Sequence, residues 1–344
     1  MSMKDLATAP TSADANGITV LLMNLGSPDS PDADGVRTYL AEFLSDSRVI
    51  EIPMAFWKLI LHGIILRTRP KKVTHAYDSI WFHEQDKAGY VGAPLRVYGE
   101  KIRDALQCHF GERLTVKLAM RYGNPSVKDT LRDIMDSDSS RILVLPMYPQ
   151  YSATTIATAI DQVNKHIQTM RFIPELRFVR SYWHEPAYLD AMANKIQTFW
   201  KTHARPDKLI FSYHGIPQRN VKLGDRYYAD CLATTAGIVQ RLALSEDEYL
   251  TTFQSRFGPQ QWLQPYTDKT METISREGVK SIHMLSPAFA ADCLETLEEL
   301  AILNRDIFLA NGGESFEYIP ALNDDEQHVT LFSQLIEKHI AGWE

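Results

Sequence analysis

Short apolar runs that stop at a glycine or proline turn recur along this chain, and helix-like segments follow them. The run at 209–213 (LIFSY) ends in this way at Gly215 and Pro217, which is typical of a buried strand. The run at 18–25 is likewise followed by a turn and by a helix-like segment at 36–44. Strand, turn and helix in this order open a βαβ unit. The pattern therefore predicts an α/β fold built from parallel sheets flanked by helices.

A histidine stands where the clearest of these runs stops. His214 directly follows residues 209–213, and Gly215 is expected to let the backbone turn sharply there. In open parallel sheets, ligands bind just outside the carboxyl ends of the strands. A histidine at this place can exchange a proton near neutral pH or bind a metal as the neutral imidazole. A single histidine at a turn more often only hydrogen-bonds that turn, so the rest of the chain decides between the two interpretations.

The length of 344 residues favours two domains, because it is long for one hydrophobic core. Besides the two runs above, strands are predicted at 115–119, 141–145, 249–254 and 279–285. The expected limits are 17–180 for the first domain and 181–324 for the second, with a C-terminal helix within 325–344 that packs back on the first domain. Residues 1–16 are polar, and we expect a disordered tail there rather than a signal peptide.

Composition and charge exclude several classes of protein. The formal net charge is −7, which argues against a general nucleic-acid binder, because phosphate binding needs a basic face. The three cysteines are scattered without CxxC spacing, as expected of reduced thiols in a cytosolic protein. No apolar run approaches the roughly 20 residues that cross a bilayer.

The most apolar stretch of the chain is followed at once by basic residues. Residues 54–66 (MAFWKLILHGIIL) precede Arg67, Arg69, Lys71 and Lys72. We call residues 54–72 the lip. It is too short to span a membrane, but it is suited to lie at a lipid interface with its basic residues facing anionic lipid. A core helix with a basic exit explains the same pattern equally well. Pro70 is expected to end the helix.

Polar and aromatic residues gather after two of the predicted strands. The turns at 120–125 (MRYGNP) and 146–152 (PMYPQYS) combine arginine, tyrosine, serine and proline. Such residues at strand ends suit a pocket for a flat, partly charged ligand, although tyrosine and proline are also common in ordinary loops. A third strand end, that of 279–285, precedes a predicted helix at 288–300. At helical period, Asp292, Glu295 and Glu299 share one face of this helix. An acidic stripe is most often a solvated surface, but one that faces His214 could hold a divalent ion and move protons.

Motifs spread over residues 18–323 resemble those of the ferrochelatase family. They are MNLGSP (23–28), LHGIILRTRPKK (61–72), MRYGNPS (120–126), PMYPQYSATT (146–155), SYHGIPQR (212–219), GDRYY (224–228), FQSRFGPQQWLQPYTD (253–268) and SPAFAADCLETLEEL (286–300). Their number and order make the combination highly specific.

The resemblance implies an enzyme that inserts Fe²⁺ into protoporphyrin IX with release of two protons, the last step of heme synthesis. It implies two Rossmann-like domains with the porphyrin in the cleft between them. The family's invariant histidine matches His214 and its essential acidic residue matches Glu295, as catalytic and metal-binding groups. Asp292 and Glu299 match acidic positions that relay protons or metal. Porphyrin-lining positions of the family match Leu25, Arg121, Tyr122, Tyr148, Ser152 and Trp262.

The resemblance also implies that the lip is the membrane-facing rim of the cleft, at the cytoplasmic face of the inner membrane. We expect a cytoplasmic monomer with Fe²⁺ as substrate, no permanently bound cofactor and no iron–sulfur cluster, since no cysteine-bearing extension follows residue 323. Two positions depart from the family pattern. Cys293 stands where some members carry a histidine, and Leu303 stands where related chains often continue the acidic stripe. Any role of Cys293 in handling protons or metal is therefore in doubt, and the metal route is expected to be shorter or differently lined.

Two alternatives remain. The chain could metalate coproporphyrin III or another tetrapyrrole, or use Co²⁺, although the apolar lip favours a poorly soluble porphyrin. It could also be a carrier that binds a tetrapyrrole or a metal without turnover. The presence of both His214 and Glu295 argues against a carrier.

Overall fold

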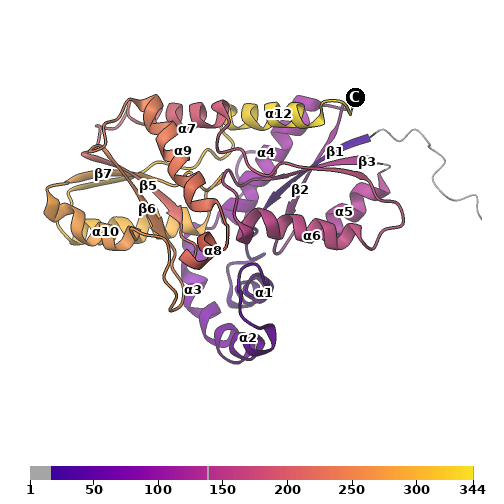
Figure 1. Ribbon diagram of the computed structural model, residues 1–344, viewed down its shortest axis with the longest axis horizontal. Coiled ribbons are helices and arrows are strands. Elements are labelled where there is room, and N and C mark those ends of the chain that lie inside the picture. The colour runs from indigo at the N-terminus through magenta and orange to yellow at the C-terminus, as the bar shows by residue number, and fades with distance from the viewer. Residues whose placement is uncertain (1–16, 138, 344) are drawn as a thin grey trace, which may run out of the picture.

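Two four-stranded parallel sheets form the frame of the molecule (Figure 1). The computed structural model describes residues 17–137 and 139–343, so the tail predicted at 1–16 lies outside the described residues. The strand order is β2-β1-β3-β4 in one sheet and β6-β5-β7-β8 in the other, and every neighbouring pair is parallel. The second order therefore repeats the first with four added to each number. This arrangement confirms the predicted α/β class.

The strands lie close to their predicted positions, and two of them were not predicted. Their bounds are β1 Gly17–Asn24, β2 Thr115–Met120, β3 Ser139–Pro146, β4 Glu175–Phe178, β5 Lys208–His214, β6 Tyr249–Gln254, β7 Ser281–Leu285 and β8 Ser315–Tyr318. The central strands are buried on both faces, which is why they show continuous apolar runs. The unpredicted strands are β4 and β8, which have four residues each and lie at sheet edges.

Helices cover both faces of the sheets. They are α1 Ala33–Phe43, α2 Met54–Ile60, α3 Leu66–Ile80, α4 Pro94–Phe110, α5 Val127–Asp136, α6 Thr158–Ile167, α7 Pro186–Phe199, α8 Gln218–Lys222, α9 Tyr227–Leu242, α10 Thr267–Thr273, α11 Arg305–Ala310 and α12 Glu326–Ile340. The described residues also form three π-helical segments, η2 Leu61–Ile65, η3 Ala153–Ala157 and η5 Glu295–Asn304, and a short 3₁₀ turn, η4 Ile274–Glu277. Figure 1 shows α7 and α12 along one side of the molecule, α6 and α10 along the other, and α1–α3 projecting as a separate lobe.

The lip is helical throughout, and the prediction that Pro70 ends its helix is wrong. Pro70 lies inside α3, which continues to Ile80. A proline has no N–H to offer the carbonyl four residues earlier, which is that of Leu66. Arg37 Nε of α1 donates to this carbonyl instead, at 3.2 Å. The neighbouring helix thus supplies the hydrogen bond that the proline removes.

Among the described residues, no helix combines the length and apolar character that crossing a bilayer requires.

One apolar core joins the two sheets. Its buried side chains include Leu22 of β1, Phe211 of β5 and Phe332 of α12. Helix α12 packs against both α4 and α7, so the C-terminal helix lies across the two halves of the chain. The carboxyl ends of the central strands β1 and β5 are thereby held at fixed positions next to the lobe formed by α1–α3.

Candidate active site

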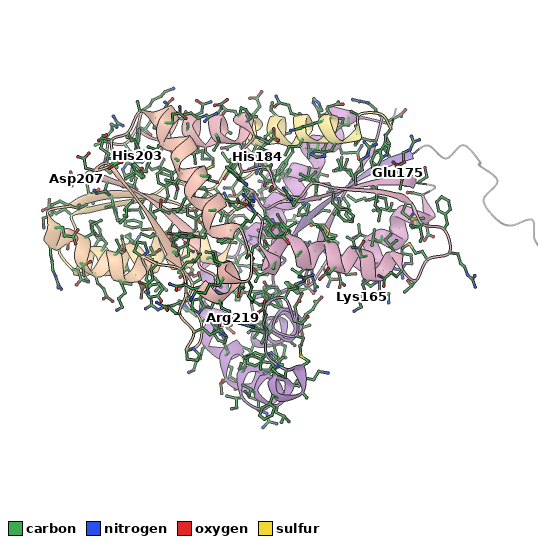
Figure 2. All side chains as sticks on the ribbon, viewed as in Figure 1. Lys165, Glu175, His184, His203, Asp207 and Arg219 are labelled. Carbon is green, nitrogen blue, oxygen red and sulfur yellow. The ribbon has the colours of Figure 1, made fainter. Side chains whose placement is uncertain are left out.

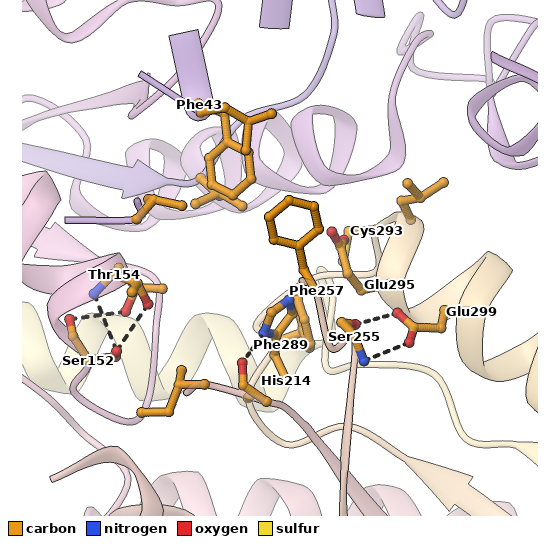
Figure 3. Close-up of a pocket in the computed structure, with 18 of the residues that line it drawn as sticks. Phe43, Ser152, Thr154, His214, Ser255, Phe257, Phe289, Cys293, Glu295 and Glu299 are labelled. Atoms are coloured by element: carbon orange, nitrogen blue, oxygen red, sulfur yellow. Dashed lines mark hydrogen bonds between the residues drawn. The ribbon is translucent and has the colours of Figure 1, made fainter. Parts of the chain in front are cut away.

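A cavity of 580 Å³ opens where the carboxyl ends of the two sheets meet the lobe of α1–α3. The last residues of the central strands, Asn24 of β1 and His214 of β5, both line it. This is the place where open parallel sheets bind ligands. Figure 3 shows Phe43, Phe257, Phe289, His214 and Glu295 around the same space. The wall therefore combines aromatic rings with a few titratable groups.

His214 is oriented by the carbonyl of the next residue. Its Nδ1 lies 2.7 Å from the oxygen of Gly215. A carbonyl oxygen only accepts, so Nδ1 carries the hydrogen, and Nε2 of the neutral ring is the atom with a lone pair. The ring of Trp262 lies beside it, with 6.5 Å between ring centroids. His214 can therefore accept a proton or ligate a metal through Nε2.

Gly215 is needed here for space rather than for a sharp turn. Its φ is not positive, which corrects the predicted reason for a glycine at this position. A Cβ on Gly215 would lie 2.9 Å from the main-chain oxygen of Gln254 and 3.3 Å from the ring of Trp262. The close approach of these backbones seats the histidine against the neighbouring strand.

Glu295 begins the π-helix η5 and lines the cavity. The predicted helix at 288–300 therefore starts later than expected and is wider than an α-helix. Asn304 Nδ2 donates to the carbonyl of Glu299 at 2.7 Å, so a side chain satisfies part of the π-helical backbone. π-Helical segments are rare and concentrate at functional sites. The wider turn places Glu298 and Glu299 together with Glu295 along the cavity.

Glu299 is held by the main chain and side chain of one serine. Ser255 donates to its two carboxylate oxygens, from N at 2.8 Å and from Oγ (Figure 3). Burial raises the pKa of Glu299 to about 7, although the bonds from Ser255 act in the opposite direction. Burial, followed by the charge of Glu295, also raises the pKa of Glu298. Glu299 can thus exchange a proton near neutral pH, as its predicted relay position requires.

Asp292 lies apart from this group. It precedes η5, so the prediction that it shares a helix face with Glu295 and Glu299 is wrong. Its side chain is 2% exposed, and it is not among the residues that line the cavity. Thr296 Oγ1, Tyr318 OH and Asn323 Nδ2 donate to its carboxylate at 2.7–2.9 Å. The carboxylate therefore connects the start of η5 to the end of β8 and to the segment that follows it.

The remaining predicted residues divide into two groups. Leu25, Tyr148, Ser152 and Trp262 line the cavity, whereas Arg121 and Tyr122 are not among its lining residues. Both of the latter side chains bond instead to the carboxylate of Asp46, and Tyr122 is fully buried. Tyr122 packs edge-on against Phe43, with 5.1 Å between ring centroids. Arg121 and Tyr122 therefore support the wall of the cavity from behind.

Gln254 was not predicted as a site residue from the sequence, although it bonds to the segments that carry His214 and Glu295. Gln254 ends β6 and is 3% exposed. Its Nε2 donates to the main-chain oxygen of Glu295 at 2.7 Å, and its own main-chain oxygen accepts from Gly215 N at 2.7 Å. Ser212 Oγ donates to its Oε1 at 2.7 Å. The strand end that carries His214 and the helix start that carries Glu295 are thus fixed to one side chain.

Other cavity residues missed from the sequence are mostly aromatic. They are Tyr39, Phe43, Trp57, Tyr77, Phe257 and Phe289. The spacing of Tyr39 and Phe43 in α1 is that of residues on the buried face of a helix. The sequence pattern does not distinguish a residue that packs in the core from one that lines a cavity. Cys293 also lines the cavity, and burial raises the pKa of its thiol well above the usual range. Cys293 is therefore neutral at physiological pH.

At the rim of the cavity, two side-chain contacts connect the lobe with the half of the chain that carries β5–β8. Arg219 Nη1 lies 2.9 Å from Glu51 Oε2, and Figure 2 shows Arg219 where α8 meets the lobe. The guanidinium of Arg69 lies 5.1 Å from the centroid of the Phe257 ring. The side chains of Arg219 and Glu51 are 58% and 38% exposed, and such surface pairs are weak. The Arg219–Glu51 pair therefore contributes little to the free energy that holds the rim together.

The described residues contain no group of three or more histidine, cysteine, aspartate or glutamate side chains arranged to hold a metal ion. His214 and Glu295 both line the cavity, and the prediction that they bind metal stays a prediction.

Comparisons with solved structures reveal the same fold. A structure of SirB from Bacillus subtilis with Fe³⁺ matches with a TM-score of 0.54 and 8% identity, covering 94% of this chain and 96% of that chain. The sirohydrochlorin chelatase SirB from Bacillus subtilis subspecies spizizenii in complex with cobalt matches with a TM-score of 0.53 and 8% identity, covering 95% and 97%. At this identity the likeness shows the two-domain chelatase fold alone.

Comparisons of sequence identify the family. The ferrochelatase family model matches residues 17–340. Ferrochelatase from Marinobacter nauticus is 46% identical over 94% of this chain and 87% of its own length. Ferrochelatase 2 from Shewanella oneidensis is 46% identical over 94% and 98%, and ferrochelatase from Bordetella pertussis is 46% identical over 95% and 89%. The resemblance carried by the sequence motifs is confirmed, and the chain belongs to the ferrochelatase family.

Proposed function

We propose that this protein inserts Fe²⁺ into protoporphyrin IX and releases two protons, as the last step of heme synthesis. Family membership and the names of the curated relatives support iron insertion into a porphyrin for heme synthesis. The observation that carries the proposal is that His214, whose Nε2 carries the lone pair of the neutral ring, and Glu295 line the same aromatic cavity.

Metalation requires the loss of both pyrrole N–H protons before the four core nitrogens can bind the ion. His214 Nε2 is the neutral base that accepts a proton from the ring. Glu295 accepts a proton or delivers the ion, and Glu299 passes protons onward, because burial keeps its pKa near neutrality. Each proton thus moves from a ring nitrogen to an imidazole or carboxylate and then to solvent.

The cavity also suits the shape that the ring must adopt. A flat macrocycle keeps its nitrogen lone pairs in the plane of the ring, so a bent ring lies closer to the transition state. Phe43 is backed by Tyr122, and Tyr122 is anchored to Asp46. This side of the cavity is therefore stiff enough to press one face of the ring while His214 and Glu295 act from the other domain.

We extend the proposal to the lip, as a peripheral contact with the cytoplasmic face of the membrane. Phe56, Leu59 and Ile64 are 73%, 74% and 60% exposed. Lys58 lies among them, and Arg67 follows. Exposed apolar side chains with adjacent cations suit an anionic lipid interface. A poorly soluble porphyrin can then pass from lipid to the cavity, whose rim the same lobe forms. We further propose that the protein acts as a monomer.

An anaerobic insertion assay tests the proposed activity. The purified protein is mixed with Fe²⁺, or with Zn²⁺ as an air-stable control, and with either protoporphyrin IX or coproporphyrin III. Loss of the fluorescence of the free porphyrin is followed, with the His214→Ala variant alongside. Rapid conversion of protoporphyrin that is lost in the variant is the expected result. Preference for coproporphyrin III would contradict the proposal that protoporphyrin IX is the substrate. Binding of a porphyrin without conversion would indicate a carrier.

A further inference from the structure

The two halves of the chain place equivalent residues on the cavity. The sheet orders β2-β1-β3-β4 and β6-β5-β7-β8 correspond strand by strand, so β1 is the counterpart of β5. The last residue of β1 is Asn24 and the last residue of β5 is His214. Both residues line the cavity. Asn24 therefore occupies, in the first half, the place that the catalytic histidine occupies in the second.

The correspondence extends to the helices that follow. A π-helical segment comes after β3 in the first half and after β7 in the second, as η3 and η5. In the second half this segment brings Glu295 to the cavity, whereas in the first half it brings Ser152 and Thr154. The second half thus presents His214 and Glu295, which can exchange protons, whereas the first half presents neutral hydrogen-bonding groups at and near the start of η3.

The orientation of the Asn24 amide is fixed by its own backbone. The N–H of Leu25 donates to Asn24 Oδ1 at 2.8 Å, so the other side-chain atom is the NH₂ group. This nitrogen is buried and has no hydrogen-bond partner among the described residues, in a side chain that is 3% exposed. Buried amide donors are nearly always paired. An acceptor is therefore missing next to the cavity wall.

The substrate supplies acceptors of a suitable kind. The core of a metal-free porphyrin carries two N–H donors and two bare nitrogens that accept. His214 Nε2 is an acceptor and matches the N–H groups, whereas the Asn24 NH₂ group is a donor and matches the bare nitrogens. We propose that Asn24 is a substrate-binding residue that donates a hydrogen bond to a bare core nitrogen of the metal-free ring. This inference rests on the proposed function.

Substitution of Asn24 tests the proposal through ligand discrimination. Asn24→Asp keeps the oxygen that accepts from Leu25 N but replaces the donor with an acceptor, and Asn24→Ala removes the side chain. Binding of metal-free protoporphyrin IX and of zinc protoporphyrin is measured by fluorescence titration. All four nitrogens of the zinc complex are already used. Both variants should bind the metal-free ring about tenfold more weakly, the loss of one hydrogen bond, and bind the zinc complex within about twofold of the wild type.

A matched control separates binding from stability. Thr19 is a buried residue of the same strand, and its hydroxyl pairs with that of Ser139 at 2.8 Å. Thr19→Val removes this bond far from the cavity and should leave both affinities unchanged. An equal loss of affinity for the two ligands in the Asn24 variants would assign Asn24 a structural role and would overturn the proposal. Unchanged affinity for both ligands would overturn it as well. Wild-type protein that binds the metal-free ring without metalating it would overturn the proposed activity but not this contact.

Discussion

The side-chain amide of Gln254 donates a 2.7 Å hydrogen bond to the main-chain oxygen of Glu295, and the main-chain oxygen of Gln254 accepts an equally short bond from Gly215. His214 precedes Gly215, so the segments that carry His214 and Glu295 are both held by one buried residue that belongs to neither of them. Preorganised groups of this kind need no rearrangement when the substrate arrives. The spacing between His214 and Glu295 is thus a property of the sheet rather than of a mobile loop.

Removal of either catalytic candidate should nearly abolish iron insertion. His214→Ala removes the neutral base, and Glu295→Gln removes the carboxylate while preserving its shape. The loss of a positioned proton acceptor lowers rates by about 10²–10⁴-fold. Insertion rates under anaerobic conditions measure the effect, and circular dichroism should show an unchanged fold. Normal turnover by either variant would show that the assignment is wrong.

The fold was largely predictable from the sequence, because buried parallel strands leave continuous apolar runs such as those of β1 and β5. The edge strands β4 and β8 were missed, since four mixed residues give no periodic signal. In the site, the family motifs led to His214 and Glu295. Assuming a period of 3.6 residues put Asp292 on the same face as Glu295, whereas the segment before η5 is not helical and turns Asp292 inward.

Some hydrogen bonds of the site cannot be predicted from the pattern of a single sequence. Gln254 is a polar residue at a strand end, and only the folded chain shows that it bonds to Glu295. The family resemblance predicted that Arg121 and Tyr122 contact the porphyrin. In the structure, both side chains bond to the carboxylate of Asp46 and lie behind the cavity wall. Long-range hydrogen bonds of this kind depend on tertiary packing, which local propensity does not encode.

Gln254→Leu should reduce turnover more than it reduces porphyrin binding. The leucine loses the bonds to Ser212 and Glu295 and leaves polar groups unpaired, so the free energy of unfolding should fall by about 1–3 kcal/mol. Because Glu295 is then less well positioned, kcat should fall by about tenfold. Gln107→Leu is the control, since Gln107 also bonds to main-chain groups, at 2.7–3.1 Å, but lies outside the cavity. An equal fall in kcat in both variants would contradict a positioning role for Gln254.

The stability of the protein should depend on pH through Glu299. Its pKa is raised by burial from an ordinary value of 4.5 to about 7, so the folded state binds this proton more tightly than the unfolded state does. The contribution of Glu299 to stability is therefore fully present below pH 4.5 and is lost as pH rises to about 7. Each pKa unit corresponds to about 1.4 kcal/mol, so the loss approaches about 3 kcal/mol.

Urea unfolding of the wild type and of Glu299→Gln at pH 5 and pH 8 measures this contribution of Glu299. The glutamine cannot ionise, so the variant should gain stability relative to the wild type at pH 8 but not at pH 5. The exposed residue Glu314 provides the control, because Glu314→Gln removes one carboxylate from the surface. If Glu314→Gln changed stability relative to the wild type by the same amount between pH 5 and pH 8 as Glu299→Gln does, ionisation of Glu299 would be excluded as the cause of the pH dependence.

Membrane binding should depend on the exposed apolar side chains of the lip. Replacing Phe56 and Leu59, which are 73% and 74% exposed, by serine removes apolar area that would enter the lipid interface, where each buried side chain of this size contributes about 1.5–3 kcal/mol. Co-sedimentation with vesicles of phosphatidylcholine and phosphatidylglycerol should fall at least tenfold, whereas metalation of detergent-dispersed porphyrin should be unchanged. Phe172 is 61% exposed but lies outside the lip, so Phe172→Ser should sediment like the wild type. If Phe172→Ser released the protein as readily as the lip variant, the attraction to lipid would be general hydrophobicity, and the lip would have no special part in it.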